Sequence, residues 1–223
     1  MIKAMIFDFD GVIVDTENKK IRDLRKVLGR YEYAMEIGLS LLGKKTEKYL
    51  SKKFPEVPKN LIEKIVKERR EIQYEDFGQY KLIRGLRDLL EFLKSKKLAI
   101  AITTGSEREF VNKLLEVNSL TRYFDLIIAG EDFKSSKPNP ECYAVTLSRI
   151  GLKPSEVLII EDSLAGIEAA KKLEIKVFAV RTYLDEQELS IADKVFRNHV
   201  DVLDFLKNQS SRTFASRGFC PTQ

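Results

Sequence analysis

Apolar residues follow two different rhythms along this chain. Between residues 16 and 80 they recur every three or four positions, as at Ile21 and Leu24, which is the spacing of one face of a helix. This pattern predicts a helix over residues 17–28 and a longer helix over residues 61–78. No strand pattern interrupts the block, so we expect it to be all-helical.

Outside this block, short apolar runs alternate with amphipathic segments. The runs predict strands over residues 4–7, 98–103, 125–129, 157–160 and 176–180. The segments between them predict helices over residues 86–93, 107–117, 140–150, 164–173 and 200–206. Strands that alternate with helices are typical of a parallel sheet covered on both faces, with right-handed crossovers. We therefore expect an α/β fold with a Rossmann-like parallel sheet, whose ligands bind at the carboxyl ends of its strands.

These two rhythms predict two domains, one inserted into the other. The α/β core should comprise residues 1–14 and 82–207, and the helical insertion, or cap, residues 15–81. The last residues, 208–223, lack periodicity, so we expect this tail to be disordered.

Composition narrows the class of protein. The chain has 223 residues, of which 43% are hydrophobic, and this is enough for a large core. It has no run of some 18 apolar residues, so no membrane span is expected. The N-terminus enters a strand almost at once, which argues against a signal peptide. Cys142 and Cys220 fit no metal-ligand spacing, so we expect a reduced, cytoplasmic protein.

The net charge of +5 is concentrated in the helical insertion. Residues 15–81 contain 17 Lys and Arg against 12 Asp and Glu. One interpretation is a solvated helical surface. The other is a positive lid over an acidic, metal-binding floor, which would attract phosphorylated anions. Basic residues are mixed with acidic ones and no aromatic platform accompanies them, so nucleic acid is not an expected partner.

Two aspartates end the first predicted strand. Side chains two positions apart on a strand point the same way, so Asp8 and Asp10 should leave it together, with Gly11 allowing the turn. Two carboxylates aimed at one point repel each other unless a cation or a shared proton lies between them. The pattern indicates a Mg²⁺ site, although a strand that simply ends in two surface aspartates would have the same sequence pattern.

Polar groups also follow the later strands. Thr103, Thr104, Gly105 and Ser106 stand at the end of the second strand. A hydroxyl beside backbone N–H groups suits a phosphate oxygen, but it could instead cap the next helix. Lys137 lies in a proline-stiffened loop after the third strand, and Glu161-Asp162 follows the fourth. That acid pair could hold a metal or cap the helix that begins at residue 164.

Together these stretches resemble a known family. DFDGVIVDTE at residues 8–17 is similar to the first motif of the haloacid dehalogenase superfamily, in its phosphatase and phosphomutase branch. The hydroxyl after residue 103, the KPNP at 137–140 and IIEDSLAGIEAA at 159–170 resemble its second, third and fourth motifs. The resemblance covers roughly residues 2–207, and the insertion matches the family's small helical C1 cap.

The resemblance implies a role for each of these residues. It makes Asp8 the nucleophile and Asp10 the general acid and base, with Lys137 as an electrostatic clamp. It places phosphate on Thr104 and Gly105, with Thr103 as a near alternative to Thr104. It implies Mg²⁺ held by the carboxylates of Asp8, Glu161 and Asp162 and by the backbone carbonyl of Asp10. The implied reaction is two-step phosphoryl transfer through an aspartyl-phosphate.

Two activities and one binding role remain open. A phosphatase hydrolyses a small phosphomonoester, such as a sugar phosphate or phosphoglycolate-like acid. A β-phosphoglucomutase-like enzyme would return the phosphoryl group to a sugar, but we would expect Arg where Thr46 stands and His where Lys20 stands. His199, the chain's one histidine, is expected on the surface. The phosphatase is therefore favoured over the mutase, and a non-catalytic phospho-ligand binding module comes last.

The expected partner is a small phosphorylated metabolite, with the protein itself a monomer or weak dimer. The cap, which supplies specificity in this family, does not disclose the substrate. Arg84 precedes Gly85 where the family usually has proline, and Arg108 is expected in the first turn of a helix.

Overall fold

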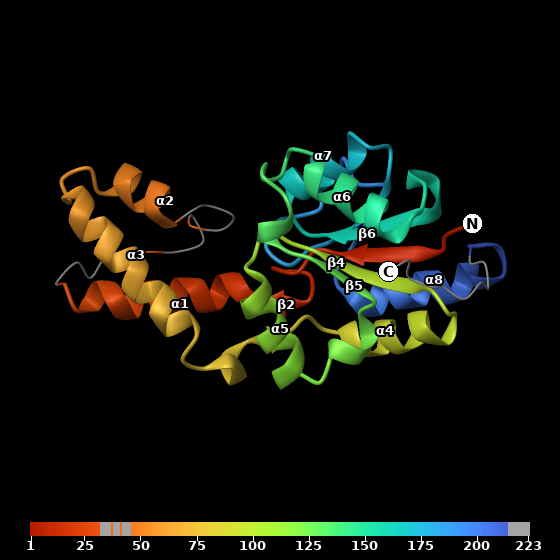
Figure 1. Cartoon of the computed structure of the whole chain (residues 1–223), viewed down its shortest axis with the longest axis horizontal. Coiled ribbons are helices and arrows are strands. Elements are labelled where there is room, and N and C mark those ends of the chain that lie inside the picture. Colours follow the sequence, from red (N-terminus) through yellow and green to blue (C-terminus); the bar gives the residue numbers. More distant parts are fainter. Residues whose placement is uncertain (32–36, 38–40, 42–45, 214–223) are drawn as a thin grey trace. The chain divides into compact units, whose positions relative to one another are not determined.

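The computed structural model describes residues 1–31, 37, 41 and 46–213. Contacts divide the chain into two compact units (Figure 1). We call the first, Met1–Val14 with Leu82–Gln223, the α/β unit, and the second, Asp15–Lys81, the helical unit. Two short strands at the boundary, β2 (Val14–Asp15) and β3 (Lys81–Leu82), pair with each other. Among the described residues, no helix is long and apolar enough to cross a membrane.

The α/β unit is built on a six-stranded sheet in the order β5-β4-β1-β6-β7-β8. Its strands, all paired in parallel, are β1 (Ala4–Phe7), β4 (Ala99–Thr103), β5 (Leu126–Ile128), β6 (Val157–Glu161), β7 (Lys176–Val180) and β8 (Lys194–Phe196). The predicted parallel α/β fold is confirmed. The edge strand β8 has no counterpart in the sequence prediction, because three partly exposed residues are too short for a recognisable apolar run.

Helices cover both faces of this sheet. Figure 1 shows α6 (Glu141–Ile150) and α7 (Leu164–Lys171) on one face, and α4 (Leu86–Ser95) and α8 (His199–Thr213) on the other. The fifth helix, α5 (Arg108–Val117), connects β4 to β5. Because both faces are covered, β1 is a continuous apolar run with no exposed position.

The strand order creates a topological switch point at one end of the sheet. Strand β1 lies between β4 and β6, so the chain builds outward on one side and then starts again on the other. Such a reversal opens a crevice at the carboxyl ends of the strands. Phe7 of β1 is paired with Ile160 of β6, so the residues that follow these two strands start out as neighbours.

The helical unit contains α1 (Thr16–Gly29), α2 (Thr46–Lys53), α3 (Lys59–Gln73) and a short 3-10 turn, η2 (Phe77–Gln79). Its core is formed by apolar residues of these helices together with Ile37 and Leu41. Asp15 caps α1 by accepting a hydrogen bond from the backbone N–H of Asn18. The helix expected over residues 61–78 ends earlier, at Gln73, because Asp76 accepts from the Gly78 N–H and starts a separate turn.

A charged pair is buried inside the helical unit. The Lys19 ammonium lies 2.7 Å from the Asp23 carboxylate, and the two residues are 1% and 6% exposed. The same ammonium lies over the ring of Tyr80, 5.0 Å from its centroid. Removing one partner from a buried pair leaves the other charge uncompensated, which costs more than replacing both.

We expect Asp23→Asn to destabilise the protein by about 3 kcal/mol, because it leaves the Lys19 cation buried without a counter-charge. The free energy of unfolding in urea measures this. The paired variant Lys19→Met/Asp23→Leu, which removes both charges, should recover most of the loss. A single variant as stable as the parent, or a paired variant less stable than the single one, would contradict this view of the pair.

His199 is buried, so the prediction of a surface histidine is wrong. It is 0% exposed because it begins α8, which packs against the sheet. Its ring nitrogen Nε2 lies 2.6 Å from the Val12 carbonyl oxygen and serves as the donor. Its other nitrogen, Nδ1, is buried and has no hydrogen-bond partner among the described residues. Burial lowers the pKa of His199 from 6.5 to about 4, although the Val12 hydrogen bond opposes this.

This pKa predicts that acid destabilises the fold. Between pH 6.5 and about 4 the unfolded chain takes up a proton on His199 that the folded protein does not. Stability from this group is therefore complete above pH 6.5, falls by roughly 3 kcal/mol as the pH drops, and levels off below pH 4. Urea unfolding of the parent and His199→Gln across this range measures the difference. Equal pH slopes for the two proteins would contradict it.

Two other expectations from the sequence, on the C-terminal tail and on Arg84-Gly85, can be compared with the structure. Helix α8 continues to Thr213, so residues 208–213 are helical within the tail for which disorder is expected. Arg84 is exposed, and its carbonyl accepts from the His199 N–H. Gly85 has φ +84°, and a Cβ there would lie 2.6 Å from the Val200 nitrogen. This position therefore requires glycine.

Candidate active site

The first aspartates follow β1 in a tight turn. The Asp8 N–H still donates to the Ile160 carbonyl of β6, at 3.0 Å, so Asp8 lies at the very end of the sheet. Gly11 has φ +81°, and a Cβ at this residue would lie 1.9 Å from Asp162 Oδ2. Gly11 is therefore needed both for the turn and to leave room for the Asp162 carboxylate.

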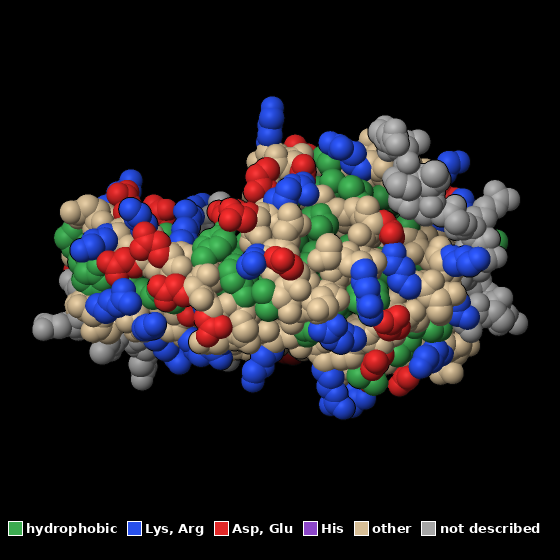
Figure 2. Space-filling view, turned by 60° about the horizontal axis from the view of Figure 1, so that its bottom comes forward, with side chains coloured by type: hydrophobic (Ala, Val, Ile, Leu, Met, Phe, Trp, Pro, Cys, Tyr) green, Lys and Arg blue, Asp and Glu red, His purple; other side chains and the backbone are tan. Residues whose placement is uncertain are grey.

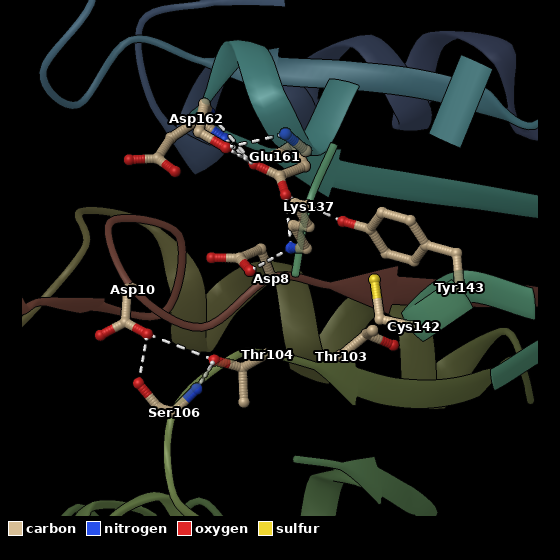
Figure 3. A network of polar contacts seen from close by, with 12 residues as sticks. Asp8, Asp10, Thr103, Thr104, Ser106, Lys137, Cys142, Tyr143, Glu161 and Asp162 are labelled. Atoms are coloured by element: carbon tan, nitrogen blue, oxygen red, sulfur yellow. Dashed lines mark hydrogen bonds and ion pairs between the residues drawn. The ribbon is translucent and has the colours of Figure 1, made fainter. Parts of the chain in front are cut away.

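Three carboxylates meet at the switch point of the sheet. Asp8 comes from the end of β1, and Glu161 and Asp162 from the end of β6 (Figure 3). One oxygen from each lies within 4.8 Å of the others, and all three residues are buried. Sequence reasoning assigned these three carboxylates to a metal, and the structure brings them together.

The Lys137 ammonium lies between two of these acids. Its Nζ donates to Asp8 Oδ1 at 2.5 Å and to Glu161 Oε1 at 2.6 Å (Figure 3). The loop that carries it is held at both sides: Glu141 accepts from the backbone N–H groups of Lys134 and Ser135, and Lys172 donates to the Pro138 carbonyl. The lysine is thus fixed by its own loop as well as by the acids.

Glu161 is more fully hydrogen-bonded than the sequence suggests. Its Oε1 accepts from Lys137 and from the Tyr143 hydroxyl, at 2.8 Å. Its Oε2 accepts from the Ser163 hydroxyl and from the N–H groups of Asp162 and Ser163. Gly166 is what leaves room for this carboxylate, because a Cβ there would lie 1.7 Å from Oε1. Glu161 could ligate a metal only by giving up one of these bonds.

Burial and mutual charge shift the pKa values of the ionisable groups in this cluster. Burial raises the pKa of Asp8 to about 8 against the attraction of Lys137, and Glu161 and Asp10 raise it further. Burial, followed by the charges of Glu161 and Asp8, raises the pKa of Asp162 well above its usual range. Burial opposes the charged form of Lys137, but the charges of Asp8 and Glu161 outweigh it and raise the pKa of Lys137. Burial likewise opposes the charged form of Glu161, but the charge and hydrogen bond of Lys137 outweigh it and lower the pKa of Glu161.

This donor set fits Mg²⁺. Asp162 is only 6% exposed, and no described residue donates a hydrogen bond to its carboxylate, so a cation beside it would stabilise its charge. Hard oxygen donors in a small cluster suit Mg²⁺, which keeps several waters in its coordination shell. Asp8 and Asp162 are the carboxylates best placed to hold it, with Glu161 beside them.

Asp10 lies in a separate hydrogen-bonded group. Its Oδ2 accepts from the Ser106 hydroxyl at 2.6 Å and from the Thr104 hydroxyl at 3.2 Å (Figure 3). Thr104 Oγ1 in turn accepts from the Ser106 N–H at 3.0 Å. Thr103 points elsewhere, since its hydroxyl pairs with that of Thr146 at 2.6 Å inside the core. The structure thus places Thr104, and not Thr103, beside Asp10.

Sequence reasoning gave Ser106 no role of its own and missed Tyr143 as part of this site. Ser106 had a usable signal, because it follows Thr104 by two positions after a strand. Tyr143 had none, since an aromatic residue on a helix is usually a core residue. Arg108 begins α5, and its side chain donates to the Ile127 carbonyl and to Asp132 instead of to the cluster formed by Asp8, Glu161 and Asp162.

Two predicted positions of the helical unit can be compared with the structure only in part. Lys20 pairs with Glu17 at 3.0 Å, and Thr46 is buried at the start of α2. The rest of the cap loop, residues 42–45, lies outside the described residues, as does Cys220.

Comparisons with known proteins agree on a family. The family profile described as haloacid dehalogenase-like hydrolase matches residues 5–180. A phosphorylated carbohydrates phosphatase of Thermotoga maritima is 33% identical over 78% of this chain and 83% of its own length. A phosphoglycolate phosphatase of Aquifex aeolicus is 30% identical over 77% and 81%. The solved structure of a β-phosphoglucomutase candidate from Thermotoga maritima superposes with a TM-score of 0.78, at 28% identity, and covers 93% of this chain and 99% of that one.

Proposed function

This chain belongs to the haloacid dehalogenase-like hydrolase family, and from that premise we propose that it is a Mg²⁺-dependent phosphatase acting through an aspartyl-phosphate. Phosphatase relatives support a phosphoric monoester hydrolase. We propose as its substrate a small phosphomonoester, either a sugar phosphate or a phosphoglycolate-like acid, because relatives named for both kinds of substrate resemble it, at 33% and 30% identity.

The geometry around Asp8 is the observation that carries this proposal. Its carboxylate stands at the switch point of the sheet, 2.5 Å from the Lys137 ammonium and next to two further acids. An ammonium fixed there can stabilise negative charge as it develops on a transferring phosphoryl group. A metal bound at the acids would neutralise phosphate charge and lower the repulsion between Asp8 and its anionic substrate.

In the proposed first step an Asp8 oxygen attacks phosphorus and the bond from phosphorus to the leaving oxygen breaks. Asp10 donates its proton to that oxygen, so the alcohol leaves neutral. In the second step Asp10 takes a proton from water as the water attacks phosphorus, which releases phosphate and restores the Asp8 carboxylate. Thr104 and Ser106 hold the Asp10 carboxylate in the arrangement described above.

A sugar phosphate mutase is the second candidate, because a β-phosphoglucomutase candidate shares this fold at 28% identity. Lys20 and Thr46 stand where that activity would lead us to expect His and Arg. Phosphatase activity therefore remains the better-supported proposal.

A phosphate-release assay decides between these functions. The panel comprises sugar phosphates, phosphoglycolate, nucleotides and pyrophosphate, each with Mg²⁺ and with EDTA. The proposal expects release from at least one sugar phosphate or from phosphoglycolate, lost in EDTA. Conversion of glucose phosphates only with a bisphosphate primer, without free phosphate, would favour the mutase. No release from any compound would favour a non-catalytic phospho-ligand binding module.

A further inference from the structure

A groove that shares no residue with the acidic centre lies on the helical unit. This α1 groove has a volume of about 390 Å³. Its lining comes from α1 at Asn18, Arg22 and Arg25, from the residue before α1 at Asp15, and from the segment after η2 at Gln79 and Lys81, over the side chain of Ile21. Its volume lies in the range of small-molecule sites.

The groove carries an excess of positive charge. It presents Arg22, Arg25 and Lys81 against a single carboxylate, Asp15. That carboxylate already accepts from the backbone N–H and the side-chain amide of Asn18, at 3.2 and 2.8 Å. Within the part of the chain that the structure describes, Arg22 and Lys81 are exposed, and their side chains have no hydrogen bond or ion pair. The groove therefore keeps a net excess of positive charge, with three cations against one carboxylate.

This local excess differs from the rest of the unit. On the face seen in Figure 2, basic and acidic side chains of the helical unit lie intermixed. Several of its other cations have partners, among them Lys19 with Asp23, Lys20 with Glu17 and Arg30 with Glu68. This unit contains 17 basic and 12 acidic residues. Part of the excess positive charge therefore lies in the α1 groove, which three cations line.

We propose that the α1 groove binds a small anion with one or two phosphate groups, as a site additional to the acidic centre. Arginine presents a planar fork that pairs with phosphate oxygens through two parallel hydrogen bonds. Arg25 keeps its terminal nitrogens for this purpose while its Nε donates to the Ile37 carbonyl at 2.7 Å. The side chains of Asn18 and Gln79 suit hydroxyl groups on the same ligand.

The position of the groove suggests what a bound anion would do. Asp15 and Lys81 are the first and last residues of the helical unit, and both line the groove. A ligand that contacts them touches both points at which the chain enters and leaves this unit. It would therefore restrain the two segments of backbone that must rotate in any movement of the unit.

The test is a titration of the ¹⁵N-labelled full-length protein with inorganic pyrophosphate at low salt in EDTA, followed by amide NMR shifts. EDTA removes the metal on which the proposed phosphatase activity depends, and the amides of the groove report binding whether or not the acidic centre is active, so failure of one proposal is distinguishable from failure of the other. We expect saturable shifts at Asn18, Arg22 and Gln79, weakened by added NaCl. Arg22→Gln should raise the dissociation constant on the order of tenfold.

Lys26→Gln is the matched control, because it removes the same charge from an exposed position of α1 that does not line the groove. Its dissociation constant should stay within about twofold of the parent. The amide spectrum shows whether each variant is folded. Shifts confined to residues around Asp10 and Gly105, equal affinity of Arg22→Gln and the parent, or equal losses in both variants would each overturn the proposal.

Discussion

Replacing Asp8 by asparagine should abolish phosphate release, with kcat reduced by about 10⁴-fold or more while the protein stays folded. The amide has nearly the same shape as the carboxylate but is not a nucleophile. The fold should survive because Lys137 keeps its other partner, Glu161, at 2.6 Å, and because burial already disfavours the charge of Asp8. Phosphate release measures kcat, and circular dichroism with thermal unfolding measures the fold.

Asp204→Asn is the matched control for this variant, since it makes the same chemical change at an exposed position of α8 and should leave kcat unchanged. If Asp8→Asn kept more than about a tenth of the parent kcat, Asp8 would not be the nucleophile. If the variant were unfolded, the comparison would move to Asp8→Glu, which keeps the charge but displaces the attacking oxygen and should be similarly inactive.

Replacing Lys137 by methionine should lower kcat by about 10²- to 10³-fold. The ammonium touches both Asp8 and Glu161, so its loss removes a fixed positive charge from the place where phosphoryl charge develops. It also leaves three buried carboxylates facing one another. We therefore expect the variant to gain more thermal stability from added Mg²⁺ than the parent does.

Lys134→Met, at an exposed position of the same loop, controls for loss of a lysine from this region and should behave like the parent in both measurements. A Lys137→Met protein with kcat within about twofold of the parent would remove Lys137 from the mechanism. A low kcat together with an unchanged response to Mg²⁺ would leave its catalytic role intact but contradict its part in balancing the acids.

The sheet was predictable because its strands are buried on both faces. Residues 4–7 and 176–180 read as strands directly from their apolar runs, and the structure gives the same bounds for β1 and β7. The position of the site followed from the same rule, since polar residues just after parallel strands must gather at one edge. The resemblance already favoured Thr104 over Thr103, and the structure gives the physical reason, because the Thr103 hydroxyl pairs with that of Thr146 inside the core while the Thr104 hydroxyl donates to Asp10.

Contacts between distant residues were beyond what the sequence pattern discloses. Tyr143 and Glu161 are 18 positions apart, and nothing in the local spacing of either one indicates that they meet. His199 reaches Val12 across 187 positions, so its burial depends on where α8 lies, which no periodicity encodes. The α1 groove likewise depends on the backbone placing Lys81 beside Arg22.

Gly166 has a consequence for anyone who engineers this protein. A glycine inside a helix usually invites replacement by alanine, which gains up to about 1 kcal/mol in helix propensity. In α7 that exchange would set a methyl group 1.7 Å from a carboxylate oxygen of Glu161. The displaced acid would lose its hydrogen bond from Lys137, so a substitution chosen to improve thermal tolerance should instead yield a less stable and slower enzyme.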